Sequence, residues 1–166
     1  KIFANKLKYK LRDGISDFVS SGKLILGVCN GFQVLVKCGL LPGSSKGFAG
    51  QTVTLSYNDI GRFQDRWIYL KAESDKCVFT RGIKSLYLPV NHGEGKFMAK
   101  EDVIHDLEKH DKVVFRYVDG DGRIAGFPWN PNGSLKNIAA ICNENGTVFG
   151  LMPHPEKFLY AVNHPR

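Results

Sequence analysis

The first twenty residues have the hydrophobic spacing of an amphipathic helix. Apolar side chains recur every three or four positions, at Phe3, Leu7, Leu11, Ile15 and Phe18. Ser20-Ser21-Gly22 follows and predicts the end of this helix. The next apolar run, 24–28, is nearly continuous, which predicts a short buried strand. A helix followed by a fully buried strand is typical of a parallel α/β sheet.

The remaining pattern predicts one more helix and then mostly strands. A helix is expected over 30–38. Gly39 and Pro42 follow this run and predict its end. A short helix is also expected over 101–110. Strands are predicted over 51–57, 67–72, 85–90, 113–118, 124–127, 138–142 and 147–152. The turn sequences 119–122 (Asp-Gly-Asp-Gly) and 143–146 (Asn-Glu-Asn-Gly) predict two hairpins, so antiparallel strands accompany the parallel ones.

A cysteine stands where the first strand meets the second helix. In Gly27-Val28-Cys29-Asn30-Gly31 the apolar run stops at the thiol, as in a nucleophile elbow with Cys in place of Ser. Glycines on both sides fit a turn that crowds backbone against backbone. The helix start offers free N–H groups and a positive dipole end, which favour a lowered thiol pKa and a stabilised oxyanion. A cysteine that merely packs in the core is the alternative.

A histidine and a carboxylate follow the last predicted strand. In Met152-Pro153-His154-Pro155-Glu156 the two groups are two residues apart in a proline-flanked, extended segment, so both point to the same side. A cysteine nucleophile needs a base, and the base needs a carboxylate to fix its tautomer. Because sites form at the carboxyl ends of parallel strands, we predict a triad of Cys29, His154 and Glu156.

A third segment, Asn91-His92-Gly93-Glu94-Gly95, also ends a strand. Two glycines around a carboxylate indicate backbone that approaches a ligand closely. A tight turn explains the same residues equally well, so the segment alone leaves both interpretations open.

Composition limits the class of protein. The 166 residues are 43% hydrophobic, as expected for one globular domain. The net charge is +7, but the positive residues are scattered; the densest cluster is Lys1, Lys6, Lys8, Lys10 and Arg12. A solvated basic helix face is the preferred interpretation, ahead of an acidic partner and far ahead of nucleic acid.

The cysteines and the missing motifs narrow the class further. Four dispersed cysteines without a Cys-x-x-Cys pair argue against structural zinc and a disulfide framework, and favour a reducing cytoplasm. No apolar run is long enough to span a membrane. Without a phosphate-binding or dinucleotide glycine motif, nothing indicates that this chain itself binds ATP or NAD.

The motifs together resemble a known enzyme family. Residues 27–33 combined with 154–156 are similar to class I glutamine amidotransferases. Residues 88–97, 130–134 (Asn-Pro-Asn-Gly-Ser) and 151–156 resemble, within that class, the glutaminase subunits of phosphoribosylformylglycinamidine synthases, and the resemblance covers nearly the whole chain. It implies a three-layer, flavodoxin-like α/β fold with a mostly parallel central sheet. It also implies that 1–166 is a single glutaminase domain without its N-terminal strands and C-terminal end.

The resemblance also implies a chemistry for the site. Cys29 would attack the side-chain amide of glutamine while His154 transfers protons and Glu156 orients it. The Asn30 N–H would be one oxyanion donor, and the second would come from a glycine-rich loop on an earlier strand that this sequence lacks. The residues expected to hold glutamine are Gln33, Asn91, His92 and Gly93.

Partners are implied in the same way. Ammonia would pass to an ATP-dependent synthetase subunit, accompanied by a small accessory subunit, in purine synthesis. ATP and magnesium are expected on the synthetase, and no cofactor is expected in this chain. Two alternatives remain open: another cysteine hydrolase of the same fold, such as a peptidase, and a non-catalytic scaffold.

Overall fold

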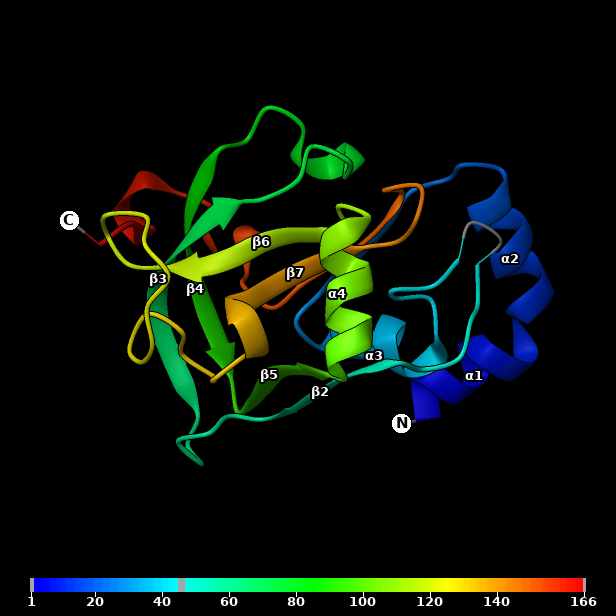
Figure 1. The fold of residues 1–166 in the computed structure, drawn as a ribbon, viewed down its shortest axis with the longest axis horizontal. Coiled ribbons are helices and arrows are strands. Elements are labelled where there is room, and N and C mark those ends of the chain that lie inside the picture. The colour runs from blue at the N-terminus through cyan, green and yellow to red at the C-terminus, as the bar shows by residue number, and fades with distance from the viewer. Residues whose placement is uncertain (1, 45–46, 166) are drawn as a thin grey trace.

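The computed structural model describes residues 2–44 and 47–165. Its helices are α1 (Ile2–Lys10), α2 (Arg12–Ser20), α3 (Asn30–Cys38) and α4 (Glu101–Lys109). Its strands are β1 (Ile25–Val28), β2 (Val53–Tyr57), β3 (Gln64–Ala72), β4 (Ser85–His92), β5 (Glu94–Ala99), β6 (Val113–Val118), β7 (Ile138–Cys142) and β8 (Val148–Leu151). Six strands form one sheet in the order β1-β8-β7-β6-β3-β4, and β2 pairs with β5 in a second sheet (Figure 1).

The predicted α/β fold is confirmed, but the mostly parallel sheet is not found in the described residues. There, β1 and β8 are parallel, and every other neighbouring pair in the six-stranded sheet is antiparallel. The predicted hairpin at 143–146 forms and joins β7 to β8. A connection this short can join only antiparallel neighbours, because a parallel pair needs a crossover of about a dozen residues or more.

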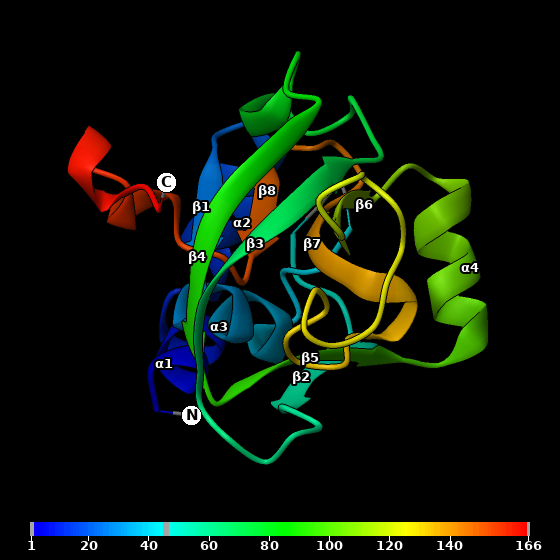
Figure 2. The same cartoon turned by 90° about the vertical axis from the view of Figure 1, so that its left-hand side faces the viewer.

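The sheet curls, so that its β4 end lies beside its β1 end (Figure 2). The backbone N–H of His154, just after β8, donates to the Pro89 carbonyl on β4 at 2.8 Å. The Cys29 Sγ, just after β1, lies 3.9 Å from the Asn91 carbonyl oxygen on β4. The carboxyl ends of β1, β8 and β4 therefore meet at one place, although β4 is five positions from β1 in the strand order.

The single helix predicted at the start is two helices. The backbone leaves helical geometry at Leu11 (φ −119°, ψ 14°), between α1 and α2. This break separates the faces of the two helices, and the expected apolar stripe does not pack as a unit. Phe3 and Phe18 are exposed, and the buried residues are Ala4 and Val19.

The strand predictions hold best where the apolar runs are longest. The predicted strands 113–118 and 138–142 have the same bounds as β6 and β7. The bounds of the other predicted strands that form differ from the observed ones by up to three residues at either end. Residues 124–127 form no strand: the turn at Asp119 closes through Gly122 N–H to the Asp119 carbonyl, but the backbone after it joins no ladder. The strand β5 was not predicted, because Gly93, just before it, and Gly95, its second residue, indicate a turn.

Helix α3 packs closely against β1 and β8 because two glycines face it. Gly27 and Gly150 are paired in register. A Cβ on Gly27 would lie 2.6 Å from Leu35 Cδ1, and one on Gly150 would lie 2.7 Å from Leu41 Cδ1 and overlap the Phe32 ring. These glycines place the beginning of α3 directly over the ends of the two strands.

Candidate active site

Cys29 occupies the strained turn expected of a nucleophile elbow. Its backbone has φ 49° and ψ −105°, a conformation that non-glycine residues rarely adopt. The turn is fixed on both sides, because Cys29 N–H donates to the Leu151 carbonyl at 2.8 Å and Gln33 N–H donates to the Cys29 carbonyl at 3.1 Å. Strain of this kind persists where the surrounding structure enforces it, and it concentrates at functional sites.

The two glycines of the elbow differ. A Cβ on Gly27 would lie 2.8 Å from both the carbonyl carbon and oxygen of Gly31, so the predicted crowding is confirmed there. A Cβ on Gly31 would meet nothing within 4 Å outside its own helix, so the same explanation is wrong for Gly31. The carbonyl group of Gly31 is the part of this residue that crowds Gly27, so the close approach requires a glycine at position 27 and not at position 31.

The pKa of the Cys29 thiol is raised above its ordinary value, in contrast to the lowered value predicted. Burial is the largest cause, because a half-buried thiolate loses hydration. The Asn30 N–H at the start of α3 and the Lys157 ammonium act in the opposite direction, while the Glu156 carboxylate adds to the rise. The start of α3 lowers the pKa of the thiol by less than desolvation raises it, so the thiol is protonated near pH 7.

His154 and Glu156 form the predicted pair. His154 Nδ1 lies 2.5 Å from Glu156 Oε1, with the imidazole largely buried and the carboxylate largely exposed. The backbone between them is a 3₁₀ turn (Pro155–Lys157) and not the extended segment expected. His154 does not contact the thiol through a hydrogen bond here: its Nε2 is buried without a hydrogen-bond partner among the described residues.

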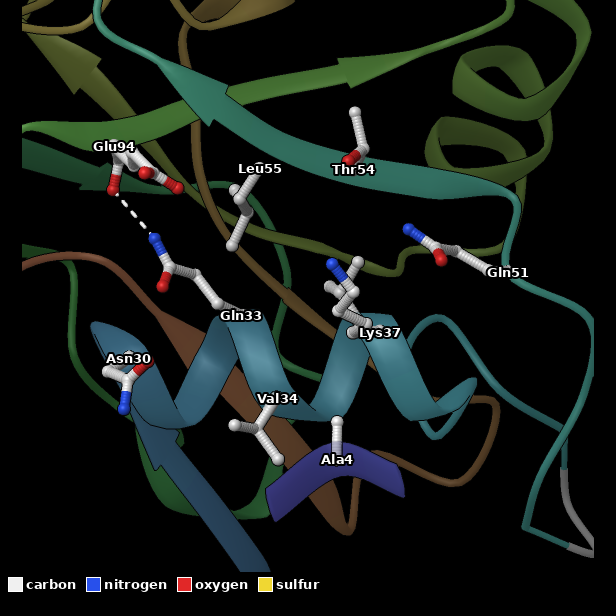
Figure 3. Close-up of a pocket in the computed structure, with 10 residues that line it drawn as sticks. Ala4, Asn30, Gln33, Val34, Lys37, Gln51, Thr54, Leu55 and Glu94 are labelled. Atoms are coloured by element: carbon white, nitrogen blue, oxygen red, sulfur yellow. Dashed lines mark hydrogen bonds between the residues drawn. The ribbon is translucent and has the colours of Figure 1, made fainter. Parts of the chain in front are cut away.

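A cleft of about 280 Å³ begins one residue beyond the thiol (Figure 3). Among its lining residues are Asn30 and Gln33 from α3, Thr54 from β2 and Glu94 from β5. Gln33 Nε2 donates to the Glu94 carbonyl at 2.9 Å, which leaves its Oε1 free to accept. Cys29 itself does not line this cleft, so the cleft adjoins the elbow at the N-terminus of α3.

The segment at the end of β4 lies beside the thiol, but its histidine faces the interior. The His92 side chain is 3% exposed, and its Nδ1 lies 3.2 Å from Asn58 Oδ1. Burial lowers the pKa of His92 to about 4, so the ring is neutral near pH 7. The imidazole of His92, a residue expected to hold glutamine, therefore lies in the interior, while Asn91 and Gly93 are partly exposed on either side of it.

Comparison with known proteins identifies the family of this chain. Residues 1–166 match the model of the CobB/CobQ-like glutamine amidotransferase domain. The chain belongs to this glutamine amidotransferase family. The resemblance seen in its motifs is thereby confirmed.

Within this family, the chain is clearly similar to curated proteins that share one name. The chain is 44% identical to phosphoribosylformylglycinamidine synthase subunit PurQ of Methanococcus maripaludis, over 98% of this chain and 61% of the relative. It is 49% identical to the protein of the same name from Dehalococcoides mccartyi, over 100% of this chain and 64% of the relative. The chain thus spans less than two thirds of the length of these relatives.

A solved structure agrees with these relatives. PurLQS from Thermotoga maritima matches with a TM-score of 0.70 and 32% identity, over 98% of this chain and 63% of that chain. None of the described helices of this amidotransferase is long and apolar enough to cross a membrane.

Several residues that shape the site lie in no pattern that would predict their role. Gly150 admits α3 to the sheet, and Asn58 and Asn132 bind the segment that follows β4. The asparagine-rich run 130–134 contributes to the family resemblance, but its composition by itself predicts only an ordered loop. No local pattern could have paired Asn132 with Gly95, which is 37 residues away.

Proposed function

We propose that this chain is the glutaminase component of a phosphoribosylformylglycinamidine synthase. The observation that carries the proposal is the strained Cys29 elbow, placed at the end of a strand whose parallel neighbour leads into the His154–Glu156 pair. The names of the curated relatives supply the pathway.

The His154–Glu156 contact favours the tautomer that a base requires. An ionised carboxylate can only accept, so Glu156 holds the proton of the imidazole on Nδ1 and leaves the Nε2 lone pair open. Nε2 of His154 is the ring nitrogen that has no hydrogen-bond partner among the described residues. For catalysis the Cys29 thiol turns from the Asn91 carbonyl to Nε2 and gives up its proton there.

The reaction then proceeds in two balanced steps. The Cys29 sulfur forms a bond to the side-chain carbonyl carbon of glutamine, the C–N bond breaks, and the proton on His154 leaves with the nitrogen as ammonia. Water activated by His154 next adds to the thioester, the C–S bond breaks, the thiol regains its proton, and glutamate is released. The Asn30 N–H, which already interacts with the thiol, is the proposed donor to the oxyanion.

Glutamine is proposed to lie between the elbow and the segment after β4. The cleft beside Asn30 and Gln33 offers polar groups for its amino-acid end, including the free Oε1 of Gln33. Asn91 and Gly93 contribute from the opposite side. The imidazole of His92 lies behind this surface and acts through the backbone it supports.

The ammonia is proposed to serve a synthetase subunit, in a complex that includes a small accessory subunit. The likeness to PurLQS supports this assembly. ATP and magnesium are assigned to the synthetase, because neither of the glycine motifs for nucleotide phosphates occurs in this chain.

The test is glutamate release from glutamine by the full-length protein, with and without the synthetase, ATP and the formylglycinamide ribonucleotide. Cys29→Ser should abolish release, since removal of one triad member typically costs several orders of magnitude. Cys38→Ser is the matched control, because its Sγ donates to the Leu35 carbonyl at 3.4 Å and a hydroxyl can do the same.

Three results would contradict the proposal. Full activity in Cys29→Ser would exclude the nucleophile. Peptide cleavage without glutaminase activity would favour the peptidase alternative. Amidine formation from ammonia but never from glutamine would exclude the pathway and leave a glutaminase with another acceptor.

A further inference from the structure

We propose that Asn58 and Asn132 are positioning residues that fix the glutamine-binding segment 91–95 against the Cys29 elbow. This inference rests on the proposed function and extends it to two residues that lie outside the triad and outside the cleft beside Gln33.

The segment is unusual in that five consecutive backbone carbonyls each have a hydrogen-bonding partner outside the β3–β4 ladder. The pairs are Asn91 O with Cys29 Sγ (3.9 Å), His92 O with Asn58 Nδ2 (2.9 Å), Gly93 O with Asn58 N (3.0 Å), Glu94 O with Gln33 Nε2 (2.9 Å) and Gly95 O with Asn132 Nδ2 (2.8 Å). The first and fourth partners belong to the proposed site itself. The remaining three contacts come from the two asparagines, so groups outside the proposed site also hold the segment.

Asn132 is a rigid holder because its side chain is fully engaged. It is 1% exposed, and its Oδ1 accepts from the Ser134 N–H at 3.0 Å and from the Ser134 hydroxyl at 2.7 Å. Its Nδ2 donates to the Gly95 carbonyl and to the Tyr117 hydroxyl at 3.2 Å. Both Nδ2 donors and both Oδ1 acceptor positions are thus used, which fixes the orientation of the amide.

Asn58 holds the other half of the segment. Its Nδ2 donates to the carbonyls of Arg62 and His92, and its Oδ1 faces His92 Nδ1. Its backbone N–H donates to the Gly93 carbonyl. The side chain is 3% exposed, so water does not compete for these bonds.

Close packing at Gly95 also fixes the segment against the interior. A Cβ on Gly95 would lie 2.9 Å from His92 Nδ1 and 3.0 Å from Met152 Cε, so the backbone here is pressed onto the interior. Met152 directly follows β8 and precedes His154 by two residues. The position of the segment is therefore linked to the thiol, to Gln33 and to the strand end that carries the base.

The decisive variant is Asn132→Asp in the full-length protein, assayed at mildly alkaline pH so that the new carboxylate is ionised. It keeps the acceptor for Ser134 but replaces the donor to Gly95 with an acceptor, which repels that carbonyl. We expect the KM for glutamine to rise about tenfold to a hundredfold, the range that corresponds to losing one buried hydrogen bond, with a smaller change in kcat.

Asn137→Asp is the matched control. Asn137 belongs to the same buried network and is 8% exposed, and its Nδ2 donates to the carbonyls of Tyr117 and Ala125, neither of which lies in the segment. Both variants should lose comparable thermal stability. The control should retain the wild-type KM.

Hydrogen exchange provides a readout that does not depend on activity. The amides of 92–97 should exchange faster in Asn132→Asp than in Asn137→Asp, while amides of strands far from the segment exchange alike in the two variants. Asn58→Asp, which removes the donor to the His92 carbonyl, should repeat the effect if Asn132→Asp does not fold. Equal KM and equal exchange in the Asn132 and Asn137 variants would overturn the positioning role. Absence of glutaminase activity in the wild type would instead overturn the proposed function, and exchange would still decide the role of the asparagines.

Discussion

The buried His92 predicts that the protein loses stability as the pH falls through a defined window. Its pKa is lowered from 6.5 to about 4, chiefly by burial. Below pH 6.5 the unfolded chain binds a proton at this position, whereas the folded chain binds one only near pH 4. Because the unfolded state binds more protons in this window, the free energy of unfolding falls as the pH is lowered.

The magnitude follows from the two pKa values. A pKa difference of about 2.5 corresponds to about 3 kcal/mol, lost in full below pH 4. At pH 5 the loss is about 2 kcal/mol, because the unfolded imidazole is then almost completely protonated and the folded one is almost completely neutral. For a domain of this size that is a large part of the usual free energy of unfolding.

The assay is urea unfolding of the protein at a series of pH values from about 8 to 4.5. His92→Asn is the informative variant, since the asparagine amide can still donate to Asn58 Oδ1 but does not titrate. It should be less stable than the wild type at pH 8 and should show a shallower pH dependence. His105→Asn, at an exposed position of α4, should follow the wild-type curve. Parallel curves for the wild type and His92→Asn between pH 7 and 5 would refute the assignment of a neutral buried imidazole.

Three further predictions concern the elbow and its base. Gly150→Ala should destabilise the protein by about 1–3 kcal/mol in urea unfolding, because its Cβ would overlap the Phe32 ring, whereas Gly31→Ala, with open space around it, should not; equal losses would contradict the packing of α3. Iodoacetamide should alkylate Cys29 before the three buried cysteines, which mass spectrometry of peptides can show. Because the pKa of Cys29 is raised, the alkylation rate should keep rising with pH beyond the ordinary thiol pKa. A rate that levels off well below that pKa would mean a stabilised thiolate. His154→Ala should reduce glutamate release more than Glu156→Gln does, because the carboxylate orients the imidazole without taking its proton, and the reverse order would exclude His154 as the base.

The sequence by itself determined the parts of the site that depend on local geometry. An apolar run that stops at a cysteine between two glycines predicts a sharp turn, and the φ of 49° at Cys29 agrees with it. His154 and Glu156 are two residues apart, so short-range geometry alone brings them into contact. Helix and strand positions such as 113–118 follow for the same reason, because hydrophobic periodicity is a property of neighbouring residues.

Only the tertiary structure decided what surrounds these groups. The curl of the sheet brings β4 to the thiol, and no residue pattern specifies how far a sheet curls. His92, which the sequence analysis assigned to substrate binding, is buried because Asn58 and Gly95 pack against its ring, and both contacts depend on the tertiary structure. The raised pKa of Cys29 likewise reflects the loss of hydration in a packed site, which outweighs the helix terminus that the sequence indicated. The contact of Asn132 with Gly95 joins segments 37 residues apart, and such contacts depend on how all the intervening elements pack.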